Sequence, residues 1–182
     1  MNDVMWYLSR STGIVAVVLA VASLMWGFLF SAHETGTRRR PAWWLDLHNW
    51  LGGLALIFTI AHLVTSVLNR DAGIAIASVF VPGIASTYRL ALAWGVIATY
   101  LFATTVLTSW PRRLFSRRTW RIVHLSSVVG VALALVHGYQ MGTDASARLF
   151  RLGMLVVVAA GTYTLGVRLF GVIAKQRKPS RQ

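Results

Sequence analysis

The chain has 182 residues, of which 56% are hydrophobic and only 13% are charged, whereas soluble domains carry about 25% charged residues. It contains no cysteine, which excludes disulfides, zinc thiolate sites and iron–sulfur clusters. The net charge of +13 would suit a nucleic-acid partner, but the basic residues lie in short clusters between long apolar runs. That pattern is typical of membrane loops and argues against nucleic-acid binding.

Five runs are long enough to cross a bilayer, which takes about 20 apolar residues per helix. The expected spans are residues 11–32, 47–69, 90–110, 122–143 and 152–174. Arg168, near the end of the last run, is placed to extend its guanidinium to the membrane surface. The expected fold is an all-α membrane protein, a single transmembrane domain over residues 1–182 built as a bundle of five transmembrane helices in contact with lipid.

The stretch 72–88 between the second and third spans is uncharged but is interrupted by Pro82-Gly83. Proline and glycine break helices, so a sixth crossing is not expected here. We expect Ile74–Val81 to form a short helix that lies at the membrane interface or covers the end of the bundle.

The basic residues also predict the orientation, because Lys and Arg accumulate on the cytoplasmic side of membrane proteins. With five spans, the three richest clusters fall on one face. They are Arg38, Arg39 and Arg40; Arg112, Arg113, Arg117, Arg118 and Arg121; and Lys175, Arg177, Lys178 and Arg181. We therefore expect a multi-pass protein of the plasma membrane with its N-terminus outside and its C-terminus in the cytoplasm.

Four of the five histidines lie in the second and fourth spans, His48 and His62 on one and His124 and His137 on the other. Their separations of 14 and 13 residues correspond to ~21 Å and ~19.5 Å along a helix axis. Because both spans run in the same direction, His48 and His124 are expected at one depth near the cytoplasm. His62 and His137 are expected together near the outer face. Each pair can supply both axial ligands of one haem iron, as an electron-transfer site requires, so two haem b groups per chain are predicted.

Other residues near these histidines are candidates to contact the two haems. Gly52 and Gly53 follow His48 by one turn and would let a macrocycle lie close to the backbone. Arg121, Arg70 and Arg89 flank the two histidine levels and are candidate partners of haem propionates.

One spacing fits poorly. A separation of 14 leaves two residues ~40° apart around an ideal helix, but a separation of 13 leaves them ~140° apart. The fourth span must therefore place its two histidines on different flanks or depart from ideal helix geometry. The fifth histidine, His33, ends the first span beside Glu34, has no partner at its depth and is expected to be an interfacial polar residue.

Two other functions compete with haem binding. A membrane histidine is often only an interhelical hydrogen-bonding group, and a small transporter or proton relay could use such residues. Proton pathways usually also contain intramembrane carboxylates, and none lies within these spans, since Asp46 is at an edge. A purely structural scaffold would explain neither histidine pair.

The motifs resemble the ferric reductase-like transmembrane family, which includes ferric reductases, the membrane part of NADPH oxidases and the haem-binding subunit of methionine sulfoxide reductase systems. The shared feature is a histidine pair 13 to 14 residues apart on each of two helices. Weaker similarities over residues 10–172 are Thr12-Gly13, Val81-Pro82, Tyr88-Arg89, Trp120-Arg121 before His124, His137-Gly138 and Gly142-Thr143-Asp144, the last two as in actinobacterial-type members. The resemblance implies haem and electron transfer.

The sequence departs from the larger relatives because it ends at Gln182 and contains no GxGxxG-type fingerprint. We therefore expect no flavin or NAD(P)H site on this chain and a separate electron donor, either a flavoprotein or a quinol. Ferric iron as the acceptor does not follow from the resemblance, and oxygen or a partner reductase are alternatives.

Overall fold

The protein is almost entirely helical in the parts of the chain that its computed structural model describes, residues 2–32, 42–110, 114–142 and 145–176. The five long helices are α1 (Asn2–Ala32), α2 (Ala42–Leu68), α3 (Arg89–Ser109), α4 (Arg117–Met141) and α5 (Arg148–Gln176). Each is long and apolar enough to cross a membrane. The predicted all-α bundle of five transmembrane helices is therefore confirmed.

The first helix begins nine residues before the predicted span, because the apolar residues Val4 to Leu8 continue the helix beyond Ser9 and Arg10. Arg10 lies inside this extension, with its guanidinium 4.6 Å from the centre of the Trp6 ring. Such a cation–π contact, together with the snorkelling that long side chains allow, lets a charge sit within a membrane helix near its end.

The segment between α2 and α3 does not cross the molecule. It folds into two short 3₁₀ helices, η1 (Arg70–Ala72) and η2 (Ile76–Val79), the second of which lies within the predicted interfacial stretch. Gly73 and Gly83 adopt positive φ angles of 61° and 84°, which glycine accepts at little cost. These turns keep the segment at one end of the bundle, which we call the loop end; the opposite end is called the tail end.

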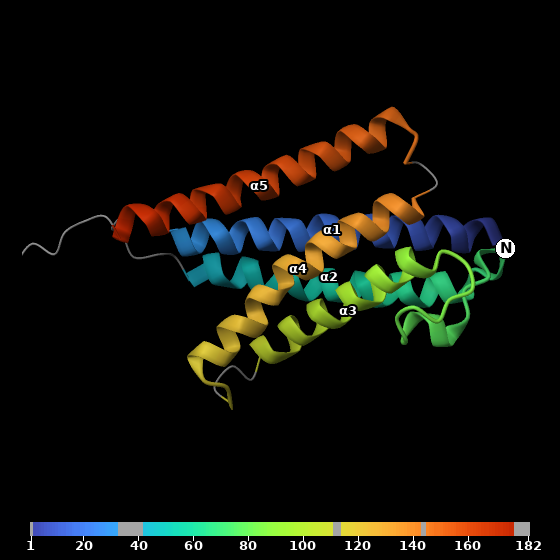
Figure 1. The fold of residues 1–182 in the computed structure, drawn as a ribbon, viewed down its shortest axis with the longest axis horizontal. Helices are drawn as coiled ribbons and strands as arrows, with labels where there is room; N and C mark the ends of the chain where they lie inside the picture. Colours follow the sequence, from blue (N-terminus) through green and yellow to red (C-terminus); the bar gives the residue numbers. More distant parts are fainter. Residues whose placement is uncertain (1, 33–41, 111–113, 143–144, 177–182) are drawn as a thin grey trace, which may run out of the picture.

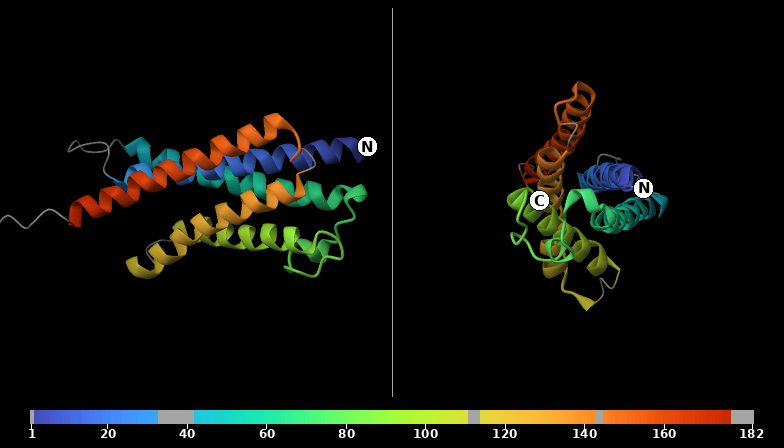
Figure 2. Two further views of the ribbon diagram at one scale, coloured as in Figure 1. Left: turned by 45° about the horizontal axis from the view of Figure 1, so that its top comes forward. Right: turned by 90° about the vertical axis from the view of Figure 1, so that its right-hand side faces the viewer.

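The helices form two antiparallel hairpins. Helix α1 packs along α2, and α3 packs along α4, whereas the two hairpins touch each other much less (Figure 1). Helix α5 packs on α1, and the view along the bundle shows it standing apart from α2 and α3 (Figure 2). The histidines described below lie on α2 and α4, where the two hairpins face each other.

Small residues allow the close packing inside each hairpin. Gly130 of α4 would place a Cβ only 3.3 Å from Leu101 Cβ and 3.5 Å from the Ala98 carbonyl of α3. Ala55 of α2 is fully buried. Membrane helices associate through such small residues, because apolar burial alone does not distinguish a neighbouring helix from lipid.

The outward faces of the helices are apolar, as a lipid environment requires. Large hydrophobic side chains are widely exposed, among them Trp50, Leu107, Leu155 and Phe170. In water such a surface would be unstable, whereas in a bilayer it contacts acyl chains. His33 and the basic residues within 33–41, 111–113 and 177–182 lie outside the described parts, so their predicted roles stay predictions.

Two histidine pairs as a candidate functional site

The four membrane histidines meet in two pairs across the space between the hairpins. At the tail end, the ring centroids of His48 (α2) and His124 (α4) are 5.8 Å apart, with ring planes inclined at 60°. At the loop end, the centroids of His62 (α2) and His137 (α4) are 6.2 Å apart, with an inclination of 72°. We call these the tail-end pair and the loop-end pair.

The 13-residue separation on α4 does not prevent this pairing. Helix α4 runs obliquely across α2 rather than alongside it (Figures 1 and 2). Side chains from different flanks of α4 can therefore reach the same face of α2, one near each end of the crossing.

Three of the histidines are held by the same kind of hydrogen bond. His62 Nδ1 donates to the Ser9 carbonyl at 2.8 Å, and His48 Nδ1 donates to the Ser23 carbonyl at 3.0 Å. His137 Nδ1 donates to the Ala91 carbonyl at 2.8 Å. Because a carbonyl oxygen can only accept, Nδ1 must carry the proton, and the Nε2 lone pair is left to bind a metal.

The fourth histidine has different neighbours. His124 Nδ1 lies 3.3 Å from the Ser109 hydroxyl rather than against a carbonyl. Its ring also stacks on Trp120, one turn earlier on α4, with centroids 4.7 Å apart and planes inclined at 24°. Both contacts restrict the orientation of the His124 ring.

Glycines on the partner helices make room for three of the rings. A Cβ added at Gly95 would lie 2.8 Å from the His137 ring, and one at Gly13 or Gly27 would lie 3.0 or 3.1 Å from the rings of His62 and His48. Any larger residue would push these imidazoles away from their carbonyl partners.

Sequence reasoning missed these glycines. The signal that could have found them is the 14-residue separation of Gly13 and Gly27, which equals that of His48 and His62 on the neighbouring helix.

The pairs fit a haem iron. Two imidazoles on opposite sides of one metal ion, each with a metal–nitrogen bond of about 2 Å, hold their ring centroids roughly 6 Å apart, close to the observed 5.8 and 6.2 Å. Within the described residues, no group of three or more His, Asp, Glu or Cys side chains is placed to hold a metal. A porphyrin supplies four ligands itself, so two histidines complete its iron.

The other predicted contact residues lie around the pairs. Gly52 is buried, and a Cβ added there would lie 3.5 Å from Ser23 Oγ. A Cβ added at Gly53 would have no other atom within 4 Å. Arg70 and Arg121 are exposed near the loop-end and tail-end levels, respectively.

The third arginine has a local partner. Arg89 Nε donates to the Gly83 carbonyl and so ties the α2–α3 segment to the start of α3. The proposed roles of Gly52, Gly53 and the three arginines toward haem stay predictions.

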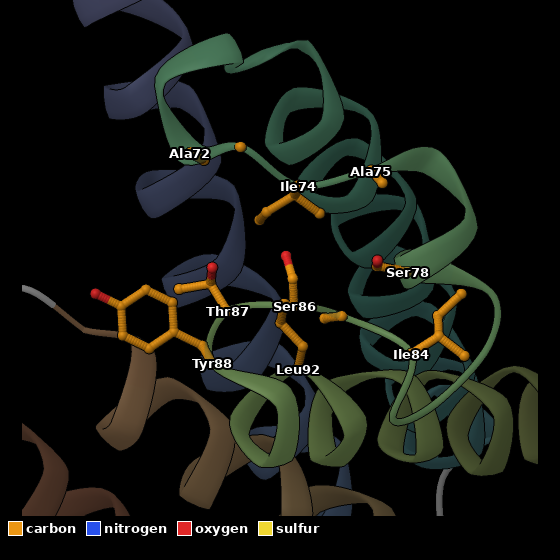
Figure 3. Close-up of a pocket in the computed structure, with 11 residues that line it drawn as sticks. Ala72, Ile74, Ala75, Ser78, Ile84, Ser86, Thr87, Tyr88 and Leu92 are labelled. Carbon is orange, nitrogen blue, oxygen red and sulfur yellow. The ribbon is translucent and has the colours of Figure 1, made fainter.

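A cavity of about 130 Å³ lies between the α2–α3 segment and the start of α3 and was not predicted from the sequence. The hydroxyl-bearing residues Ser78, Ser86 and Thr87 line it together with Ile74 and Leu92 (Figure 3). Leu92 directly follows the residue whose carbonyl accepts from His137. The cavity is therefore next to the backbone that holds the loop-end pair.

The α2–α3 segment that forms this cavity is fixed to α3. Tyr100 of α3 donates its hydroxyl to the Phe80 carbonyl at 2.6 Å. Tyr88, which precedes α3, adopts the left-handed conformation with φ of 52°, which costs a non-glycine residue energy unless its surroundings hold it there.

Comparison with known proteins gives one finding. The model of the family described as ferric reductase like transmembrane component matches residues 12–135, which is 124 of the 182 residues and includes α2, α3 and three of the four paired histidines. Comparisons with curated proteins and with solved structures give no match. Since the match covers more than half of the chain, this protein belongs to the ferric reductase like transmembrane component family.

Proposed function

We propose that this protein is a di-haem b-type cytochrome that carries electrons across a membrane between a separate donor and an acceptor. Its family makes it a transmembrane electron-transfer component, and members of the family generally bind haem. Two features of the histidine pairs carry the finer proposal. Their ring centroids are as far apart as those of two imidazoles that bind one metal ion. In three of the four rings the Nδ1 proton is donated to a backbone carbonyl, which leaves Nε2 free to bind the metal.

Each pair has a defined task in this proposal. His48 and His124 would hold one haem, and His62 and His137 would hold the other. The carbonyls of α1 and α3 keep the Nδ1 protons in place and aim Nε2 into the space between the hairpins. When bound, each haem supplies a one-electron carrier, and two of them divide a hydrocarbon core of ~30 Å into shorter transfers.

The surroundings of the pairs restrict the movement of the proposed ligands. The glycine contacts leave the rings little freedom to rotate. The outward faces of the helices carry large apolar side chains that would contact lipid rather than water. These features suit a carrier that exchanges electrons without opening its iron to other ligands.

The orientation in the membrane belongs to the same proposal. Arg117, Arg118 and Arg121 are exposed at the tail end, where α4 begins. The positive-inside rule then places the tail end in the cytoplasm and the N-terminus and the α2–α3 segment outside. The electron donor would be a flavoprotein or a quinol, and the plasma membrane is the proposed location.

A proton relay has less support. Three of the four Nδ1 protons are donated to helix carbonyls, which cannot pass a proton on. Such bonds suit fixed metal ligands better than a moving proton.

The test is the haem content of the purified full-length protein in detergent. A pyridine haemochrome assay should give two haem b per chain, with reduced-minus-oxidised spectra of the low-spin bis-histidine type. A protein that takes up one haem or none per chain on expression with excess haem precursor would overturn the proposal.

A further inference from the structure

The partner residues of the histidines follow a repeat along α1 and α3. In each case a carbonyl accepts from the histidine, and the residue four positions later is the glycine against which the ring lies. The three carbonyl–glycine sets are Ser9 and Gly13, Ser23 and Gly27, and Ala91 and Gly95. The two sets on α1 are 14 residues apart.

The repeat has a simple cause in helix geometry. A Cβ tilts toward the N-terminus of its helix, so the side chain four residues on lies over a given carbonyl. Glycine at that position leaves the carbonyl uncovered, and an imidazole from the neighbouring helix can reach it.

The same 14-residue step along α3 leads from Ala91 and Gly95 to Thr105 and Ser109. This is the level of His124, but the glycine position is now a serine. The Ser109 hydroxyl donates to the Thr105 carbonyl at 2.7 Å, and the Thr108 hydroxyl lies 3.3 Å from the same oxygen. The carbonyl that the repeat would offer to His124 is therefore occupied chiefly by the Ser109 hydroxyl, since the Thr108 hydroxyl makes its shorter bond, 2.7 Å, to the Thr104 carbonyl.

Ser109 takes over the role of the carbonyl. Because its proton points to Thr105, a lone pair of Oγ is left for His124 Nδ1–H, which lies 3.3 Å away. The corresponding distances at the other three histidines are 2.8 to 3.0 Å. Hydrogen bonds weaken with distance, so His124 has the weakest Nδ1 acceptor of the four.

The strength of this bond affects a metal bound at Nε2. An acceptor at Nδ1 makes the imidazole a more basic ligand, and a more basic ligand favours the oxidised iron. A weak acceptor therefore favours reduction.

We propose that Ser109 is the positioning residue that sets the ligand strength of His124 and makes the tail-end haem easier to reduce than a carbonyl partner would. This inference rests on the proposed function, since it requires haem at the tail-end pair. On this proposal, the two haem sites differ in ligand strength because a serine hydroxyl stands at the tail-end level where the repeat has a glycine.

The experiment is a redox titration of the haem-loaded full-length protein with both haems resolved by spectrum and by EPR. Ser109→Gly recreates the repeat and uncovers the Thr105 carbonyl, so the midpoint potential of the tail-end haem should fall. Ser109→Ala keeps the Cβ but removes the acceptor, so that potential should rise. Ser109→Thr keeps a hydroxyl and should retain the wild-type value.

Thr108→Ala is the matched control, because the Thr108 hydroxyl contacts the same Thr105 carbonyl, whereas the hydroxyl beside His124 Nδ1 is that of Ser109. It should leave both potentials unchanged, and the loop-end haem should be unaffected in every variant. Opposite shifts for Gly and Ala support the inference, as does loss of the tail-end haem in Ser109→Ala while Ser109→Thr keeps it. Shifts in the same direction, no shift, or loss of haem in Ser109→Thr would overturn it. A wild-type protein without haem would instead contradict the proposed function.

Discussion

At the scale of single residues, the site is defined by what holds each imidazole rather than by the imidazoles alone. A histidine on a membrane helix has two ring nitrogens and needs a partner for whichever carries the proton. Here carbonyls of the neighbouring helix accept from His48, His62 and His137. The glycines that uncover these carbonyls are therefore as necessary to the geometry as the ligands.

Gly95 gives the sharpest test of this view. Its replacement by alanine would put a Cβ 2.8 Å from the His137 ring, and overpacking of this kind costs about 1–3 kcal/mol. We expect Gly95→Ala to weaken or abolish haem binding at the loop-end pair, measured by haem content and low-spin EPR signals. Gly153→Ala is the control, because nothing lies within 4 Å of a Cβ there. Equal haem content in both variants would show that the close approach does not matter.

The sequence alone predicts part of this site. The fixed rise of a helix is enough to put His48 level with His124 and His62 level with His137, because both helices run the same way. It does not show which helix supplies the Nδ1 acceptors, since that depends on how α1 packs on α2. Gly52 and Gly53 are near His48 in the sequence, whereas the glycine that faces the His48 ring is Gly27, on another helix.

At the scale of the elements, the segment between α2 and α3 is fixed to α3 at two points. Arg89 Nε donates to the Gly83 carbonyl, and the Tyr100 hydroxyl donates to the Phe80 carbonyl. The break at Pro82-Gly83 predicted that this segment would not span the membrane. The cavity it forms is lined by residues from 72–78 and from 84–92, which only the folded segment brings together, so the local sequence pattern does not predict it.

Arg89 combines an anchoring contact with a positive charge near the loop-end pair. Arg89→Ala should lower the midpoint potential of the loop-end haem, because a nearby positive charge favours the reduced and more negative form. Tyr100→Phe removes only a hydrogen bond, worth about 1 kcal/mol, and should increase hydrogen exchange over residues 80–88 without moving the potential. The comparison separates charge from anchoring: equal potential shifts in the two variants would mean that Arg89 acts through the loop and not through its charge.

At the scale of the whole molecule, two helix hairpins face each other across a space that histidines line at two levels. Helices α2 and α4, which carry the two histidine levels, are each long and apolar enough to cross a membrane. Each level would then lie nearer to a different membrane surface, as the proposed electron carrier needs. The number of helices followed directly from the apolar runs, because crossing a bilayer fixes their length.

The orientation is the prediction that belongs to this scale. A fluorescent protein fused after Gln182 should fold and fluoresce, since the C-terminus is proposed to be cytoplasmic. A periplasmic-type phosphatase inserted after Gly73 should be active, since the α2–α3 segment is proposed to lie outside. The reverse pattern at both positions would mean that the basic clusters do not set the topology.

The most direct test of the central claim, two haems held by two histidine pairs, is the optical and EPR spectrum of four single variants. His62→Ala and His137→Ala should each lose one and the same haem, while His48→Ala and His124→Ala should each lose the other. The reason is that the members of a pair lie within 6.2 Å of each other, whereas the two levels are ~21 Å apart along α2. In each variant the remaining haem should keep its low-spin bis-histidine signals. Loss of a common haem in His62→Ala and His124→Ala, or unchanged haem content in any of the four, would contradict the account.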